Sequence, residues 1–254
     1  MKPNVLVICG PTASGKTALA VALAQRFHGE VVSADSMQVY RGMDIGTAKP
    51  TQEEMGGVPH HMIDVADPSE DYSVARYVDQ AVPIVDDILV RGKLAIIAGG
   101  TGLYIDNLIA GRQFAPFPGR DGLRLQLQAR AETEGLPALL AELAQVDPES
   151  AARLHPNDAK RIIRALEVYL ATGKTISQHN RESQAIPNRY TPLTIALSFR
   201  ERSQLWARID RRVDQMMSRG LEEEVRGLLA SGISPQCTAM QAIGYKEFVD
   251  ALDG

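Results

Sequence analysis

The sequence has little cysteine, few aromatic residues and no long apolar run. Cys9 and Cys237 are the only cysteines among 254 residues, so there is neither a disulfide framework nor a C-x-x-C metal site. No run approaches the roughly 18 apolar residues of a membrane span, and the first, residues 5–9, is far shorter than a secretory signal core. These absences exclude a disulfide-stabilised secreted domain and an integral membrane protein. They predict a soluble, cytoplasmic protein with no membrane partner.

The net charge of -4, taken alone, argues against a nucleic-acid partner, because contacts to phosphate need a basic surface. The charges are nevertheless uneven along the chain. Residues 151–219 carry 13 Lys and Arg but only 6 Asp and Glu, which gives this part +7 and the remainder -11. One part of the chain can therefore face a polyanion.

The first 110 residues alternate between short apolar runs and helix-like segments. Strands are expected at residues 5–9, 30–34, 60–65 and 94–98. A helix is expected at residues 17–27 and another at 73–91, which Pro83 should kink or split. Strands and helices at this spacing predict the α/β class, a parallel sheet flanked by helices with right-handed crossovers.

From residue 114 the pattern changes. A linker rich in Pro and Gly, residues 114–120, precedes helices expected at 124–134, 138–145 and 158–171, the last capped by Asn157 or Asp158. Residues 180–191 are expected to form a loop, and residues 192–199 another strand before a helix that starts at Glu201. We therefore expect a catalytic core of residues 1–114 and 190–254, interrupted by a helical insertion domain of residues 115–189.

A glycine-rich segment between the first strand and the first helix matches the phosphate-binding loop G-x-x-x-x-G-K-[ST]. Its glycines let backbone N–H groups turn toward phosphate oxygens, the lysine adds a cation, and the threonine hydroxyl can complete the coordination of Mg²⁺. The alternative is a glycine turn that matches by chance. The segment predicts a site for a di- or triphosphate and a P-loop NTPase-like fold, with the residues Gly10, Pro11, Thr12, Ala13, Ser14, Gly15, Lys16 and Thr17.

Nothing nearby favours hydrolysis of that phosphate compound. The strand expected at 94–98 ends in Gly-Gly-Thr-Gly without the magnesium-binding carboxylate of a hydrolytic NTPase. Asp35 is the carboxylate best placed at a strand end, at the sheet edge where open α/β folds bind ligands. It can accept a proton there, and Gln38 can read a base edge through two hydrogen bonds. The alternatives are that Asp35 and Thr101 only cap helices.

Seven segments together resemble the tRNA dimethylallyltransferases, also called tRNA isopentenyltransferases. They occur in the family's order along essentially the whole chain: GPTASGKT (10–17), DSMQVYRGMDIGTAKP (35–50), VPHHMID (58–64), GGTGLY (99–104), LHPNDAKRIIRALEVYLATGK (154–174), RIDRRVDQM (208–216) and QAIGYKE (241–247). The resemblance implies transfer of a dimethylallyl group from dimethylallyl diphosphate to N6 of the adenosine 3′ of the anticodon. The implied acceptors are tRNAs that read codons beginning with U.

The resemblance also implies roles for individual residues. The phosphate loop would hold the diphosphate of the donor. Lys16 would stabilise the negative charge of the leaving diphosphate, and Thr17 would help to bind Mg²⁺. Asp35 would be the general base, and Thr101 would contact the reacting groups. Arg208 and Arg212 lie in the segment that lends an arginine to the diphosphate. The residues that would contact tRNA are Asp35, Ser36, Met37, Gln38, Thr101, Lys160, Arg161, Ile162, Ile163 and Arg164.

The implied reaction agrees with what the residues suggest independently. A phosphate loop without a water-activating carboxylate suits a diphosphate leaving group, and one carboxylate is enough for an amine that loses a proton on alkylation. Residues 160, 161 and 164 share a helical face that can follow RNA phosphates, unless that face is merely solvated. A single tRNA held between two domains needs only a monomer.

Three alternative functions share parts of the pattern. An adenylate isopentenyltransferase acting on AMP or ATP would not need the helical insertion, a small-molecule kinase explains only residues 10–17, and an RNA-binding module without activity leaves Asp35 unexplained. Members of the family usually continue beyond Gly244 and Tyr245 into a basic C-terminal helix. Some affinity for tRNA is therefore expected to be missing from the 254 residues.

Overall fold

The computed structural model describes residues 4–112, 122–185 and 187–253. The chain divides into two compact units, one of residues 1–113 with 188–254 and one of residues 114–187. The linker expected at residues 114–120 lies outside the described residues. No helix in the described ranges is long and apolar enough to cross a membrane.

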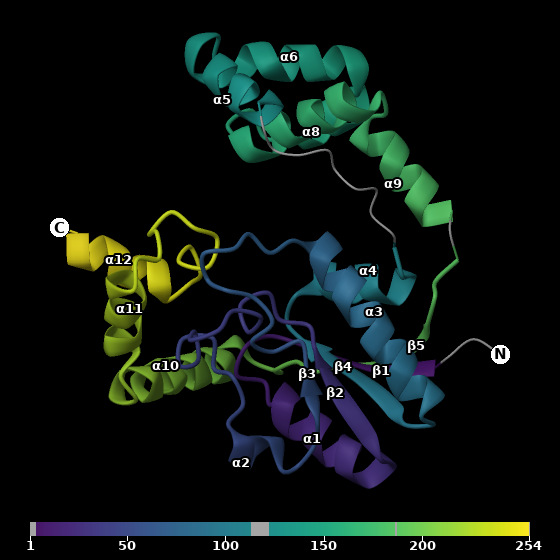
Figure 1. Cartoon of the computed structure of the whole chain (residues 1–254), viewed down its shortest axis with the longest axis vertical. Coiled ribbons are helices and arrows are strands. Elements are labelled where there is room, and N and C mark those ends of the chain that lie inside the picture. Colours follow the sequence, from purple (N-terminus) through teal and green to yellow (C-terminus); the bar gives the residue numbers. More distant parts are fainter. Residues whose placement is uncertain (1–3, 113–121, 186, 254) are drawn as a thin grey trace. The chain divides into compact units, whose positions relative to one another are not determined.

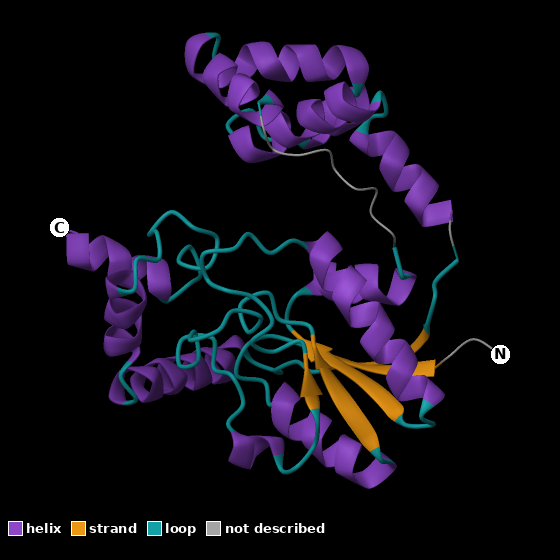
Figure 2. Ribbon diagram, viewed as in Figure 1, coloured by secondary structure: helices purple, strands orange, loops and turns teal. Residues whose placement is uncertain are grey.

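A five-stranded parallel sheet forms the centre of the first unit, with the strand order β3-β2-β4-β1-β5 (Figures 1 and 2). The carboxyl ends of parallel strands share one edge, so the loops after β1, β2 and β4 meet there. The expected fold class, α/β with a parallel sheet flanked by helices, is confirmed. The strands are β1 (Asn4–Cys9), β2 (Gly29–Ser33), β3 (His60–His61), β4 (Leu94–Gly99) and β5 (Thr191–Ala196).

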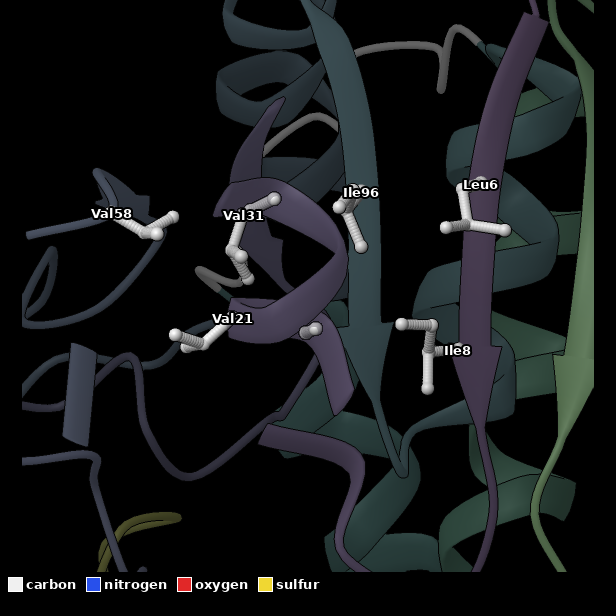
Figure 3. Close-up of a cluster of buried hydrophobic side chains, with 8 residues drawn as sticks. Leu6, Ile8, Val21, Val31, Val58 and Ile96 are labelled. Atoms are coloured by element: carbon white, nitrogen blue, oxygen red, sulfur yellow. The ribbon is translucent and has the colours of Figure 1, made fainter. Parts of the chain in front are cut away.

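Helices cover the sheet on both faces. Helix α1 (Lys16–Phe27) packs on β1, β2 and β4, while α3 (Val74–Val90) and α4 (Gly102–Ala110) pack on each other and on β4 (Figure 1). Because side chains alternate along a strand, one set of strand residues faces α1 and the other faces α3 and α4. The buried cluster on the α1 side consists of Leu6, Ile8, Ala20, Val21, Ala24, Val31, Val58 and Ile96 (Figure 3).

The first unit continues after β5 with three helices, α10 (Arg202–Ser218), α11 (Leu221–Ala230) and α12 (Tyr245–Asp253). A short helix, α2 (Gln52–Met55), precedes β3 and carries a capping box in which Thr51 and Glu54 satisfy each other's backbone N–H groups. Helices α10 and α12 bring two distant segments of the sequence into the same unit as the phosphate loop.

The second unit is entirely helical in its described part, with its own buried core. The core forms around Leu127, Leu139, Leu143, Ile162 and Leu166. The Asp147 carboxylate accepts hydrogen bonds from the N–H groups of Ser150 and Ser177, which joins the starts of two helices. The helices are α5 (Leu123–Thr133), α6 (Leu136–Val146), α7 (Pro148–Arg153), α8 (Ala159–Thr172) and α9 (Ile176–Ala185).

Three expected elements differ from the structure. The strand expected at 60–65 stops at His61, because Met62 and Asp64 have left-handed backbone conformations with φ of 63° and 57°. Helix α3 is not split at Pro83, which is exposed while Ala81 and Val85 beside it are buried.

The loop expected at 180–191 is also wrong in part, since α9 extends to Ala185. This helix has no apolar periodicity to reveal it. Thr175 and Gln178 begin it with reciprocal side-chain-to-backbone hydrogen bonds, a T-x-x-Q capping box that is visible in the sequence.

Candidate active site

The phosphate-binding loop joins β1 to α1 and has the backbone geometry that its glycines predict. Gly10 and Gly15 have φ of 150° and 89°, and Ala13 is left-handed with φ of 58°. A Cβ on Gly10 would lie 2.6 Å from the carbonyl oxygen of Leu197, so only glycine fits there. The N–H groups of residues 12–17 donate to no acceptor in the part of the chain that the structure describes. These unpaired donors at the start of a helix form an anion-binding nest.

Polar side chains of the loop support the same interpretation. The Lys16 ammonium donates to the carbonyl oxygens of Gly10 and Pro11 at 3.0 and 2.8 Å. The Ser14 hydroxyl is buried and has no hydrogen-bond partner among the residues that the structure describes. Burial lowers the pKa of Lys16, an effect that Asp35 opposes and Arg212 reinforces. A bound anion would give all of these groups a partner, which favours a phosphate compound over a purely structural turn.

Asp35 follows β2 at the carboxyl edge of the sheet. Its Oδ1 accepts hydrogen bonds from the N–H groups of Met37 and Gln38 at 2.9 and 3.4 Å, which fixes the carboxylate on its own turn. Asp35 also acts electrostatically on Lys16 and Arg212. The Asp35 carboxylate therefore interacts electrostatically with the lysine of the phosphate loop, as expected for residues that share one site.

Thr101 meets the same turn from β4. The Thr101 hydroxyl oxygen accepts from the Ser36 N–H at 3.0 Å, and the hydroxyl group lies 3.3 Å from the Ser36 Oγ. Thr101 is the N-cap residue of α4, but its side chain makes no capping hydrogen bond to that helix and binds the turn after β2 instead.

Gly99 makes this approach of β4 to β2 possible. A Cβ there would lie 2.1 Å from the Ala34 carbonyl oxygen, while the Thr101 N–H donates to that same oxygen at 3.1 Å.

Gln38 is committed to contacts within the protein. Its Oε1 accepts from the Ser33 hydroxyl at 3.0 Å, and its Nε2 lies 3.3 Å from the carbonyl oxygens of both Thr47 and Ala48. The amide group thus holds the neighbouring loop, and reading a base edge through both amide atoms would require these bonds to break. The Met37 side chain is half-buried at the same turn.

Arginines of α10 approach the site unequally. Arg212 is half-buried, and burial lowers its pKa while Asp35 and Glu54 act to raise it. Arg208 is exposed, with its guanidinium 5.7 Å from the centre of the Phe199 ring. The structure therefore brings Arg212 together with Lys16 and Asp35, whereas Arg208 lies against an aromatic ring.

The segment 160–164 belongs to α8 of the second unit. Lys160 and Arg161 are exposed, but Ile162 and Ile163 are 0% and 5% exposed and belong to the core of that unit. Both isoleucine side chains pack inward, which argues against side-chain contacts between these two residues and tRNA. The Arg164 guanidinium donates to the buried Glu167 carboxylate at 3.0 Å, which ties it to α8.

A magnesium ion would have to be bound largely through the phosphate compound. In the described ranges no three His, Cys, Asp or Glu side chains gather as a metal site. The Thr17 hydroxyl, at the second position of α1, is exposed and makes no hydrogen bond to the described residues. Mg²⁺ keeps several waters and commonly uses one or two protein oxygens with substrate phosphates, so this donor set fits such an ion.

Sequence reasoning missed several residues that support the site. Lys49 is buried and its ammonium donates to Tyr40 O and to the carboxylates of Asp44 and Asp64. Glu224 reaches from α11 to the backbone of residues 44–46. Lys49 lies within a segment of the recognised pattern, but no spacing in the sequence indicates that it is buried or what it contacts.

Comparison with known proteins identifies the family. The sequence model of the IPP transferase family matches residues 38–254, and that of isopentenyl transferase matches residues 3–70. The tRNA dimethylallyltransferase of Caldanaerobacter subterraneus subsp. tengcongensis is 51% identical over 255 residues, covering 100% of this chain and 81% of that protein. That of Geobacter sulfurreducens is 51% identical with the same coverage.

Solved structures agree with these sequence matches. The full-length tRNA isopentenylpyrophosphate transferase of Bacillus halodurans is 46% identical with a TM-score of 0.67, covering 100% of this chain and 78% of that one. A eukaryotic dimethylallyltransferase acting on tRNA is 35% identical with a TM-score of 0.84, covering 98% and 63%. With a matching family model over most of its length and relatives half identical along all of it, the chain belongs to the IPP transferase family.

Proposed function

We propose that this chain transfers the dimethylallyl group of dimethylallyl diphosphate to the N6 amine of the adenosine 3′ of the anticodon, in tRNAs that read codons beginning with U. The observation that carries this proposal is the grouping of Asp35, Lys16 and Arg212, a carboxylate beside two cations at an anion-binding loop. The names of the relatives, which are tRNA dimethylallyltransferases, supply the substrates.

The donor diphosphate would occupy the nest of residues 10–17. The allylic C–O bond breaks in the reaction, and its electron pair leaves with the diphosphate. Lys16 and Arg212 would stabilise that negative charge, and the buried Ser14 hydroxyl would gain a hydrogen-bond partner. Thr17 and the diphosphate would hold Mg²⁺, which supplies further positive charge to the leaving group.

Binding of dimethylallyl diphosphate measured by calorimetry should weaken when Mg²⁺ is removed and when Thr17 is replaced by Val.

The acceptor adenosine would lie at the turn of residues 35–38. The lone pair of N6 forms the new C–N bond, and the nitrogen then loses a proton, which Asp35 would accept. Thr101 would help to hold the reacting groups at this turn, because its hydroxyl already binds Ser36. Gln38 would shape the acceptor pocket by holding the loop of residues 47 and 48. It would contact the nucleotide only through hydrogen-bonding capacity of its amide group that these contacts do not use.

The wider partner is tRNA, whose anticodon loop is single-stranded and can present its base to such a turn. Lys160 and Arg161 on α8 are exposed and would contact RNA phosphates. The protein would work as a cytoplasmic monomer, where tRNA is available. Arg208 would join Arg212 at the diphosphate by leaving the Phe199 ring.

One assay separates this proposal from its alternatives. The protein is incubated with labelled dimethylallyl diphosphate and Mg²⁺, and with unmodified tRNA, with AMP or with ATP in parallel. We expect label on the tRNA at the adenosine 3′ of the anticodon. Free AMP or ATP is the second candidate acceptor that the parallel incubations test. Label in AMP and none in tRNA would establish that second candidate and overturn the first.

A further inference from the structure

The loop of residues 44–48 follows the turn that carries Asp35, and side chains from distant parts of the first unit hold it. Lys49 supports it through hydrogen bonds to Tyr40 O at 2.5 Å and to the Asp44 carboxylate at 2.7 Å. Ala48 has φ of 47°, a conformation that costs energy for a residue with a Cβ. Such a loop keeps its shape only while its contacts enforce it.

Glu224 makes the most extensive of these contacts. Its carboxylate accepts hydrogen bonds from three successive backbone N–H groups, those of Asp44 and Ile45 at 2.8 Å and that of Gly46 at 3.2 Å. Three converging N–H groups are an anion-binding arrangement, and here a carboxylate of α11 fills it. The loop is therefore held by the protein's own anion, 180 positions away in the sequence.

Tyr245 completes the contact from the start of α12. Its hydroxyl donates to the Glu224 carboxylate at 2.5 Å, and its ring is fully buried against Gly46. A Cβ on Gly46 would lie 2.4 Å from the Tyr245 ring, so the ring and the loop backbone are in direct contact. Burial and the neighbouring Glu224 raise the pKa of Tyr245. The phenol therefore stays protonated and remains a donor at physiological pH.

The held loop connects directly to the proposed base. The carbonyl oxygens of Thr47 and Ala48 accept hydrogen bonds from the Gln38 side chain, and the Gln38 N–H, with that of Met37, binds the Asp35 carboxylate. A displacement of the loop removes the acceptors of Gln38 and frees the turn that orients Asp35. Effective catalysis requires a base held within a fraction of an ångström of its working position.

We propose that Glu224 and Tyr245 are positioning residues for the acceptor side of the reaction, acting through the 44–48 loop and Gln38 on Asp35. This inference rests on the proposed function, in which Asp35 accepts the N6 proton. It assigns a role to two residues of the C-terminal helices that touch no reacting atom. The phosphate loop lies outside this chain of contacts, so binding of the donor should not depend on it.

The test uses Glu224→Gln and Tyr245→Phe, which preserve side-chain shape and the packing on Gly46. Steady-state kinetics with unmodified tRNA and dimethylallyl diphosphate should show kcat lower by about tenfold or more for Glu224→Gln, and by a smaller factor for Tyr245→Phe. The KM for the donor should stay within about twofold of the wild type in both. Thermal unfolding of each variant reports whether the fold is intact. Glu222→Gln is the matched control, because Glu222 lies on the same helix and pairs with Arg226 at the surface, away from the 44–48 loop.

A double-mutant cycle with Gln38→Met distinguishes positioning from a general loss of stability. In the Gln38→Met background, Glu224→Gln should lower kcat by less than about threefold, because the connection to Asp35 is already broken. Equal effects in both backgrounds, or wild-type kcat for Glu224→Gln, would overturn the inference. Asp35→Asn is measured alongside. Full activity of that variant would refute the role of Asp35 in the proposed function, whereas an inactive Asp35→Asn with a fully active Glu224→Gln would refute only the positioning role.

Discussion

At the scale of single residues, the candidate active site depends on the orientation of a few side chains as well as on their chemical identity. Asp35 is a carboxylate that its own turn holds by two backbone N–H groups, opposite Lys16 and Arg212. In the proposed reaction, a weak nucleophile such as an exocyclic amine needs one base in one position, which this short turn would provide.

Replacing Asp35 by Asn should lower turnover by a factor of ~10² or more, because the amide keeps the shape of the turn but cannot accept the proton. Binding of dimethylallyl diphosphate, measured by calorimetry, should remain largely intact. Asp79→Asn is a suitable control, since Asp79 is exposed on α3 and outside the site. If Asp35→Asn turned over as fast as the wild type, the carboxylate would have no part in the chemistry.

Replacing Gly99 by Ala should destabilise the protein by roughly 1–3 kcal/mol, because the new Cβ would overlap the Ala34 carbonyl oxygen. Gly100→Ala tests the neighbouring position, where the nearest atom to a Cβ is 4.0 Å away. Chemical denaturation of both variants measures the difference. Equal stability of the two would show that β4 and Ala34 can separate at little cost.

At the scale of elements, the two edges of the sheet have different tasks. The carboxyl edge carries the phosphate loop and the groups that we propose to be catalytic. At the opposite edge, Glu30, the second residue of β2, is a buried carboxylate that accepts hydrogen bonds from Arg91, Lys93 and His61. The Arg91 guanidinium is the largest cause that holds the pKa of Glu30 well below its usual range, with Lys93 and His61 adding to it against the effect of burial.

This network predicts a dependence of stability on pH. A carboxylate whose pKa is depressed by folding stabilises the native state above its unfolded pKa of about 4.3, and that contribution is lost as the pH falls further. Glu30→Gln should lower the free energy of unfolding at pH 7 by roughly 1.5–3 kcal/mol and flatten its decline below pH 4. Asp87→Asn is the control, since Asp87 pairs with the same Arg91 from an exposed position. An unchanged acid profile in Glu30→Gln would contradict the assignment.

At the scale of the whole molecule, the positive charge of residues 151–219 is not equally available to a polyanion. Several of the cations that lie in the second unit are paired with carboxylates. Arg161, Arg164, Lys174 and Arg181 all form salt bridges within the second unit. Among the described residues of this part, the cations that form no salt bridge are Lys160, Arg200, Arg202, Arg208, Arg211, Arg212 and Arg219. Most of the unpaired positive charge therefore lies on α10 and the turn before it.

Lys160 of α8 makes no ion pair with the described residues, so it can meet a phosphate without giving up a partner, whereas Arg161 would exchange its exposed pair with Asp158 for one. Lys160→Ala should weaken tRNA binding and reduce the slope of log K against log salt by roughly 0.7–0.9, the value for one phosphate contact. Filter binding at several salt concentrations measures this slope. Arg26→Ala serves as a control, because Arg26 is exposed in the last turn of α1, at the end away from the phosphate loop. A slope identical to that of the wild type would make Lys160 a solvated surface residue.

Much of the molecule follows from local sequence. The apolar runs, the G-x-x-x-x-G-K-[ST] spacing and the alternation of strand and helix determine a parallel sheet with a phosphate loop at its carboxyl edge, because these features depend on residues close together in the chain. The seven segments that resemble a known family determined the proposed reaction and the place of Asp35. The T-x-x-Q box that begins α9 was equally local, although it stands before a helix without apolar periodicity.

Only the tertiary structure decided which groups meet across long separations. It brought the Thr101 hydroxyl into hydrogen-bond contact with Ser36 and buried Ile162 and Ile163 in the core of the second unit. It also engaged the Gln38 amide in hydrogen bonds to the loop of residues 44–48. It also brought Glu224 and Tyr245 onto residues 44–46. The physical reason is that burial and hydrogen bonding between distant segments depend on the packing of whole elements, and no local pattern of residues encodes that packing.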